Sequence, residues 1–337
     1  MTVRGQLMAA EIAEQPAVLQ RVIDSSAAEI ATVGDIIRKR APRFVLLAAR
    51  RTSDHAALYA KYLIETRLGL PAGLASPSSF TVYGSRPDLR DVLFVAVSQS
   101  GGSPDLVDST AAAAQCGAVT VAVTNNPDSP LSNVAELHVD VSAGVERAVA
   151  ATKTYTAELL ALYLLFGGTP ADAAALPEAA QRTLELGETR ARSAARRYRF
   201  AERLVTTGRG FAYPTAREAA LKLMETSYLG AQAFSGADLL HGPLAMIDSG
   251  VPVIAVLPPG AAGEAMTPVL DRLTEGGADV LRVGTDGDLL VAADGVPDQL
   301  RPVLEILPLQ QLAWRLALDR GGDPDRPRGL SKVTSTW

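Results

Sequence analysis

The sequence is short of the residues that build disulfide, metal and nucleic-acid sites. It has one cysteine, Cys116, so an intrachain disulfide framework is excluded and a reducing, cytoplasmic location is expected. Its three histidines, His55, His138 and His241, show no metal-ligand spacing, and we expect neither a metal nor another cofactor. The formal net charge of −5 provides no basic footprint for nucleic acid or membrane lipid.

Long apolar runs are missing as well. No run reaches 18 residues, which argues against a transmembrane helix, and Glu11 comes too early for the apolar region of a signal peptide. Aromatic residues make up only 5% of the chain, so its helices are expected to pack through small side chains such as alanine. The 337 residues, 47% of them hydrophobic, are enough for two globular domains.

Apolar strands alternate with helical segments along the chain. Strands are predicted at residues 44–48, 92–97, 119–123 and 134–139. Uninterrupted apolar strands joined by helices indicate an α/β fold, in which helices cover both faces of a parallel sheet. The same order recurs later, with strands predicted at residues 203–207, 251–257 and 280–283 and a closing helix at 308–318. We therefore predict a tandem duplication of one α/β unit.

This pattern predicts five segments. They are an N-terminal helical lead (1–36), a first subdomain (37–168), a helical connector (169–198), a second subdomain (199–320) and a C-terminal tail (321–337).

A polar loop between a buried strand and a helix start is the candidate phosphate-binding site. Residues 98–103 read Ser-Gln-Ser-Gly-Gly-Ser, with Ser103 at the N-cap and Pro104 at the first helical position. Free backbone N–H groups and the helix dipole at such a place favour a phosphate dianion. Thr52 and Ser53, after the preceding strand, could add donors. The alternative is an ordinary polar loop with serine caps, and composition does not decide between the two.

A charged stripe on an otherwise apolar helix is the candidate catalytic site. Glu218, Lys222 and Glu225 are spaced i, i+4, i+7 and share one face, while the neighbouring Leu221 and Met224 are expected to be buried. Such a stripe faces either water, as a salt-bridged surface, or a cavity. The nearby His241, in a Gly-Pro turn, favours the cavity, because an acid, an amine and an imidazole suit proton-transfer catalysis.

Other polar residues have plainer interpretations. His138 lies at alternating strand spacing and is expected to be structural, and His55 is more simply a capping residue than part of a sugar site. Lys153 begins a helix, and Lys332 by itself would be an exposed terminal lysine. Cys116 is expected to be a small core residue.

Taken together, these segments resemble the sugar isomerase (SIS) domain family. Within this family, the chain resembles the isomerase half of glutamine–fructose-6-phosphate aminotransferase. It resembles SIS-type glucosamine-6-phosphate deaminases more closely still. The resemblance covers nearly the whole chain and rests on several motifs in the family's order: Met8 with Glu14–Pro16, Thr52–Asp54, Ser98–Gly101, Val149–Lys153, Ala220–Glu225, His241–Pro243 and Gly329–Lys332. It implies two tandem SIS subdomains, each with a flavodoxin-like five-stranded parallel sheet flanked by helices.

The resemblance also implies roles for individual residues. The glutamate that matches Glu225 moves a proton between C1 and C2, and the histidine that matches His241 assists ring opening from the neighbouring subunit, which implies a homodimer with composite sites. The lysine that matches Lys332 can form a Schiff base with the ketose, and the one that matches Lys222 lies beside the reacting carbons. The implied sugar-phosphate-binding set is Thr52, Ser53, Ser98, Gln99, Ser100, Ser103, Val149 and Ala151.

The leading functional prediction is an SIS-type glucosamine-6-phosphate deaminase, which converts glucosamine 6-phosphate and water into fructose 6-phosphate and ammonia. The aminotransferase itself is disfavoured, because the chain begins Met1-Thr2 without a glutaminase domain. The alternatives are a fructosamine-6-phosphate deglycase or another phosphosugar aldose–ketose isomerase, and a sugar-phosphate-sensing module without catalysis.

Three positions depart from the family's pattern. Arg51 stands directly before Thr52, where the family usually has glycine. Met224 replaces the second lysine of the catalytic helix, and Ala151 replaces the serine of the aminotransferases. The arginine could add a phosphate contact or obstruct the loop.

Overall fold

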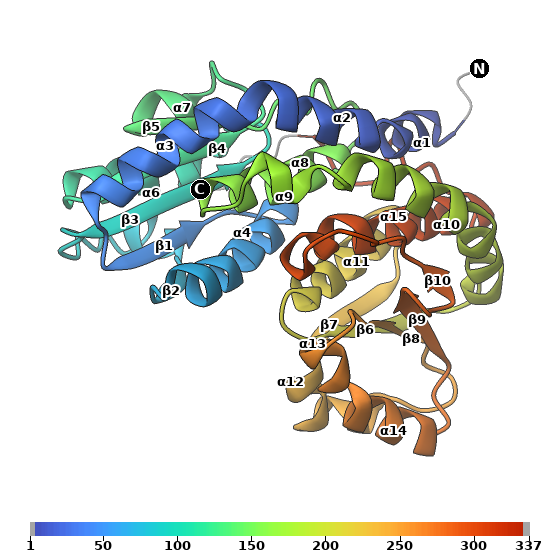
Figure 1. The fold of residues 1–337 in the computed structure, drawn as a ribbon. Helices are drawn as coiled ribbons and strands as arrows, with labels where there is room; N and C mark the ends of the chain where they lie inside the picture. Colours follow the sequence, from blue (N-terminus) through green and yellow to red (C-terminus); the bar gives the residue numbers. More distant parts are fainter. Residues whose placement is uncertain (1–3, 333–337) are drawn as a thin grey trace. The chain divides into compact units, whose positions relative to one another are not determined.

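The computed structural model describes residues 4–332, which divide into two compact units (Figure 1). The sheet-A unit contains residues 17–146 and 153–174, together with Ser331 and Lys332. The sheet-B unit contains residues 4–16, 147–152 and 175–330. No helix of the described residues is long and apolar enough to cross a membrane.

Sheet A has five parallel strands in the order β2-β1-β3-β4-β5. They are β1 (Phe44–Ala48), β2 (Ala72–Leu74), β3 (Val92–Ser98), β4 (Val119–Thr124) and β5 (Leu137–Asp140). Two groups of helices accompany them (Figure 1). One group is α3 (Ala27–Arg40), α4 (Thr52–Leu63) and α8 (Lys153–Leu165), and the other is α5 (Pro77–Thr81), α6 (Pro104–Gln115) and α7 (Pro130–Val134). The chain enters α3 through α2 (Gln15–Arg21) and leaves α8 through α9 (Pro170–Ala173).

Sheet B also has five parallel strands, in the order β10-β9-β8-β6-β7. They are β6 (Arg203–Gly208), β7 (Gly230–Ser235), β8 (Val253–Val256), β9 (Val280–Gly284) and β10 (Leu289–Leu290). The helices α10 (Leu176–Tyr198), α11 (Ala212–Ser227) and α15 (Arg301–Asp319) pack together, and α1 (Gln6–Ala13) contacts α15. A second group contains α12 (Gly236–Leu240) and α14 (Thr267–Glu275), and the short α13 (Ala261–Glu264) precedes α14.

The two sheets have the same topology. Numbered along the chain within each unit, the strands of both sheets follow the order 2-1-3-4-5. This is the flavodoxin-like order, whose ligand sites lie beyond the carboxyl ends of the strands. The predicted α/β fold with two repeated parallel sheets is therefore confirmed.

The central strands were predictable from the sequence because they are buried in the two cores and are therefore almost entirely apolar. All but the first residue of β3 is buried, and every residue of β8 is buried, as expected for strands covered on both faces. In the sheet-A unit, Phe80 packs edge-on against Phe94 with ring centroids 6.1 Å apart. Cys116 ends α6 and packs, half-buried, against the same cluster.

Several predicted boundaries were wrong. The strand expected at 134–139 begins only at Leu137, because residues 130–134 form α7. The closing helix begins at Arg301 rather than 308, with Pro308 in its interior. Edge strands β2, β7 and β10 were missed: two are very short, and β7 has glycine, glutamine and serine among its six residues.

Candidate active site

Helix α11 carries a buried network of two carboxylates and one ammonium group. Lys222 Nζ lies 2.7 Å from Glu225 Oε2 and 3.3 Å from Glu218 Oε1. The side chains of Glu218 and Lys222 are 0% and 1% exposed, whereas that of Glu225 is 12% exposed. Ions are taken out of water at a high cost unless they are paired, so the three groups stabilise one another. Glu225 is the member of this network that a ligand can reach.

The exposed part of α11 is not the charged stripe. Met224, expected to be buried, is 40% exposed, and Leu221 is only partly buried. The expectation for Met224 was wrong, because the elements that pack against α11, among them α15, β6 and β7, leave Met224 exposed while Glu218 and Lys222 are buried. Of the two alternatives for this stripe, the solvated salt-bridged surface is excluded, because Glu218 and Lys222 are buried.

His241 lies at the end of α12 and is exposed. The backbone N–H of His241 donates to the backbone carbonyl of Asp238 at 3.0 Å. The next residue, Gly242, has a φ of 126°, a conformation that favours glycine. Pro243 then begins a short 3₁₀ helix. The backbone of His241 therefore lies at a tight turn, in the same unit as Glu225.

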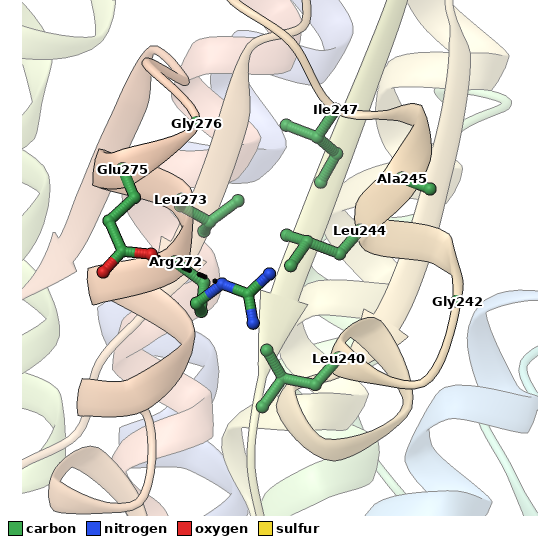
Figure 2. A pocket seen from close by; sticks show the side chains of 9 residues that line it. All are labelled: Leu240, Gly242, Leu244, Ala245, Ile247, Arg272, Leu273, Glu275 and Gly276. Atoms are coloured by element: carbon green, nitrogen blue, oxygen red, sulfur yellow. Dashed lines mark ion pairs between the residues drawn. The ribbon is translucent and has the colours of Figure 1, made fainter.

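The segment around His241 also forms one wall of an apolar groove (Figure 2). Leu240, Leu244 and Ile247 face Leu273 of α14 across a space of about 490 Å³. Arg272 and Glu275 of α14 also line the groove, and Arg272 Nε lies 3.5 Å from Glu275 Oε2. Neither His241 nor Glu225 lines this groove, so it does not unite the candidate catalytic groups.

In the sheet-A unit, the loop from Ser98 to Ser103 connects β3 to α6, as predicted. The N–H of Gly101 donates to Ser98 Oγ at 3.2 Å, and that of Gly102 to Ser100 Oγ at 3.3 Å. Ser103 is the N-cap of α6, although its side chain accepts no capping hydrogen bond.

Backbone hydrogen bonds fix this loop to the segment after β4. The carbonyl of Gln99 accepts from Asn125 N–H at 3.1 Å, and the carbonyl of Gly101 accepts from Leu131 N–H at 3.0 Å. Gly101 has a φ of 62°, and a Cβ atom there would lie 2.2 Å from Ser129 Oγ. Glycine is thus required at this position on both conformational and steric grounds.

Thr52 and Ser53 lie in the first turn of α4, and both are buried. The hydroxyl group of Ser53 donates to Glu158 Oε1 at 2.9 Å. Glu158 is on α8, where all thirteen residues are buried. The signal in the sequence for this buried carboxylate is an acid within an otherwise apolar helix.

Two consecutive arginines precede Thr52. Arg50 Nη2 lies 2.6 Å from Oδ2 of Asp105, whose side chain is 4% exposed. Asp105 is in the first turn of α6, so this ion pair connects the chain after β1 to the helix that follows the Ser98–Ser103 loop. Arg51 is exposed and has φ 55° and ψ −127° as the N-cap of α4.

Lys332 is paired within the sheet-A unit. Its Nζ lies 3.0 Å from Oε2 of Glu146, whose side chain is 0% exposed. The same carboxylate accepts from Thr154 Oγ at 2.6 Å and from Thr154 N–H at 3.3 Å. Glu146 was not among the predicted site residues.

The other residues singled out in the sequence are buried or half-buried within the protein. Val149 and Ala151 are half-buried in the irregular segment before α8, whose Thr152 carbonyl accepts from Gln310 Nε2 at 3.3 Å. His138 Nε2 lies 2.9 Å from Thr124 Oγ1, and burial lowers the histidine's pKa despite the opposing charge of Asp140. His55 and Lys153 are buried near the starts of α4 and α8.

The structure thus gathers the predicted residues into separate groups. Glu218, Lys222, Glu225 and His241 belong to the sheet-B unit, whereas Thr52, Ser53, the Ser98–Ser103 loop and Lys332 belong to the sheet-A unit. Among residues 4–332, no three histidine, cysteine, aspartate or glutamate side chains are grouped so that they could hold a metal ion.

A doubly wound α/β protein with two such sheets and a serine-rich loop after the third strand matches a known family. The SIS domain model matches residues 40–167 and 198–282, and the chain belongs to the SIS-domain family.

Individual relatives agree with this assignment. A glutamine–fructose-6-phosphate aminotransferase of Methanothermobacter thermautotrophicus is 34% identical over 345 aligned positions, which cover 97% of this chain and 57% of that protein. A Silicibacter pomeroyi protein, whose name proposes a phosphosugar isomerase, superposes with a TM-score of 0.85 at 34% identity and covers 96% of this chain and 100% of its own. The C-terminal domain of the glucosamine–fructose-6-phosphate aminotransferase of Francisella tularensis superposes with a TM-score of 0.84 at 27% identity. The superposition covers 96% of this chain and 98% of that domain. The chain therefore spans little more than half the length of the curated aminotransferases it matches.

Proposed function

We propose that this protein acts on phosphorylated amino sugars and converts glucosamine 6-phosphate and water into fructose 6-phosphate and ammonia. The observation that carries the proposal is the Glu225–Lys222 pair, in which a carboxylate that a ligand can reach is held 2.7 Å from a buried ammonium group. Membership of the SIS family, whose relatives include aminotransferases of fructose 6-phosphate, supports a phosphosugar as the ligand.

The proposed reaction begins with ring opening, in which His241 assists the movement of a proton from O1 to O5. In the open aldose, the carboxylate of Glu225 removes the proton from C2 and returns it to C1. The aldehyde at C1 becomes an alcohol, and the amine at C2 becomes an imine. Water then adds to C2, and the nitrogen leaves as ammonia after protonation, to which Lys222 contributes.

The remaining predicted residues have supporting roles in this proposal. The phosphate group is held by residues of the Thr52–Ser53 turn and the Ser98–Ser103 loop, with Val149 and Ala151 beside the sugar. Lys332 closes the site from the C-terminal tail. We further propose a homodimer in which His241 of each copy serves the site of the other, and a location in the cytoplasm.

Ammonia release from glucosamine 6-phosphate is the direct test. The native protein should release ammonia, and Glu225→Gln should reduce the rate at least 100-fold, because an amide cannot take up the C2 proton. The matched control is Glu178→Gln, which changes an exposed acid of α10 that pairs with Arg182 at 3.4 Å. Ammonia release unchanged by Glu225→Gln would refute the assigned base.

Two other functions have distinct outcomes in the same assay. A deglycase or isomerase would act on a panel of fructosamine 6-phosphates or other phosphosugars and not on glucosamine 6-phosphate. A sensing module would bind fructose 6-phosphate in calorimetry and convert none of these compounds. The buried, paired acids of α11 favour catalysis over sensing, because a sensor has no need of a carboxylate held next to an ammonium group.

A further inference from the structure

His138 is hydrogen-bonded to the end of the neighbouring strand of sheet A. It lies on β5, half-buried, and its Nε2 is 2.9 Å from Oγ1 of Thr124, the last residue of β4. Thr124 is fully buried. Because a buried hydroxyl group needs hydrogen-bond partners, this contact helps to fix the carboxyl end of β4.

The histidine is the donor in this hydrogen bond. Thr124 Oγ1 also lies 2.9 Å from the backbone carbonyl of Asn126, and it donates to this oxygen, because a carbonyl can only accept. A threonine hydroxyl has one proton, so it has none left to donate to the imidazole. His138 therefore carries a proton on Nε2 and donates it to Thr124.

The segment that follows Thr124 is bonded to the candidate phosphate-binding loop. The backbone N–H of Asn125 donates to the carbonyl of Gln99 at 3.1 Å, and that of Leu131 donates to the carbonyl of Gly101 at 3.0 Å. Thr124 also packs against the loop directly, since a Cβ atom at Gly101 would lie 3.3 Å from Thr124 Cγ2. The position of the loop therefore depends on the position of Thr124.

We propose that His138 is a positioning residue for phosphate binding: its hydrogen bond to Thr124 holds the Ser98–Ser103 loop in the place where the loop binds the phosphate group. The proposal rests on the proposed phosphosugar function of this loop. His138 acts through Thr124 and does not touch the ligand. Its loss should therefore weaken binding and leave the proton transfer by Glu225, which belongs to the sheet-B unit, unchanged.

Calorimetric titration of the full chain with fructose 6-phosphate and with inorganic phosphate tests this role. His138→Phe removes the N–H donor and should weaken the binding of both ligands about fivefold, as expected for one lost hydrogen bond. His138→Gln keeps a side-chain N–H donor and should keep most of the affinity. In the ammonia-release assay, His138→Phe should raise the KM for glucosamine 6-phosphate by a similar factor and leave kcat within about twofold.

Thr124→Val tests the same hydrogen bond from its other side. It should weaken both titrations at least as much as His138→Phe, since the contact to Asn126 is lost as well. In the Thr124→Val background, His138→Phe should change the affinity by less than about twofold, because the two side chains share one interaction. Additive losses would show that His138 does not act through Thr124, and would overturn the proposal.

Thr120→Val is the matched control. Thr120 is another buried threonine of β4, and its Oγ1 accepts from the backbone N–H of Glu136 at 2.9 Å, near the opposite end of the strand from the loop. This variant should lower the Tm through the loss of that bond and leave both Kd values unchanged. A loss of affinity equal to that of Thr124→Val would mean general loosening of sheet A, and would overturn the role of His138.

The outcomes separate this proposal from the proposed function. Binding by the native protein that His138→Phe leaves within about twofold overturns the role of His138 and leaves the phosphosugar function standing. A native protein that binds neither ligand overturns both. Weaker binding by His138→Phe and Thr124→Val, with affinity retained in Thr120→Val, supports the role of His138 over a purely structural one.

Discussion

The ammonium group of Lys332 lies 3.0 Å from the buried carboxylate of Glu146, although 186 residues separate them in the sequence. Thr154 donates to the same carboxylate at the start of α8, where the helix dipole also favours a negative charge. This carboxylate therefore fixes a C-terminal lysine to the sheet-A unit. In the proposed function, Lys332 must leave Glu146 before it can close the site over the sugar.

Replacement of Glu146 should release this lysine. Glu146→Gln is expected to reduce the free energy of unfolding by about 1–3 kcal/mol, because the charge-assisted bonds to Lys332 and Thr154 are lost inside the protein. Urea denaturation measures the change, and brief proteolysis should cleave the C-terminal end of the variant faster. Lys332→Met is the control, since it removes the ion pair and keeps the Thr154 contacts. A Glu146→Gln protein as stable and as resistant as the native one would contradict the assignment.

Lys222 is expected to be essential for the stability of α11. Lys222→Met leaves the carboxylate of Glu218, 0% exposed, without its cation, and should cost about 3–5 kcal/mol in unfolding free energy. The double variant Lys222→Met with Glu218→Gln should recover part of this loss, because the unpaired buried charge is removed. Chemical denaturation of the single and double variants gives the comparison. Equal losses in the two would show that charge burial is not the cause.

The stability of the protein should decrease with pH through Glu305. Burial is the main cause that raises the pKa of Glu305 from 4.5 to about 8, with the charge of Asp298 adding to it and that of Arg301 opposing it. Between these two values the unfolded chain loses the proton and the folded chain retains it. Stability therefore falls as pH rises through this window and levels off above the folded pKa.

Glu305→Gln isolates this contribution. Each pH unit within the window lowers the free energy of unfolding by about 1.4 kcal/mol at most. The glutamine variant should therefore have a flatter profile of unfolding free energy against pH, and at the upper end of the window it should be more stable than the native protein by up to about 5 kcal/mol. Urea denaturation at several pH values measures both profiles. Parallel profiles would mean that Glu305 is ionised in the folded state.

Gly101 should tolerate alanine poorly, and Gly84 provides a matched comparison. Both glycines have a φ of 62°, but a Cβ atom at position 84 would meet nothing within 4 Å, whereas one at 101 would lie 2.2 Å from Ser129 Oγ. Gly84→Ala should cost about 1 kcal/mol for backbone strain alone. Gly101→Ala should cost at least about 1 kcal/mol more, because Ser129 and the loop must move. Thermal unfolding compares the two variants, and equal shifts in Tm would exclude the steric clash.

The sequence predicted the elements that local periodicity defines. The strand at Phe44–Ala48 was placed with its observed bounds, and those starting at Val92 and Val119 extend one residue further than predicted. The pairing of Lys222 with two glutamates also followed from sequence, because residues three and four apart on a helix are neighbours. The short edge strands escaped prediction, since two or three residues have no measurable period.

Sequence alone determined that this chain is a duplicated α/β protein with an acidic, lysine-containing helix and a serine-rich loop, because these features depend on residues close together in the chain. Only the tertiary structure decided which polar groups far apart in the sequence are paired. It brought Ser53 to Glu158, 105 residues away, and Lys332 to Glu146, because packing of helices on the sheet sets these contacts. It also decided that the face of Met224 is exposed while the charged stripe is covered, since the elements that pack against α11 come from other parts of the chain.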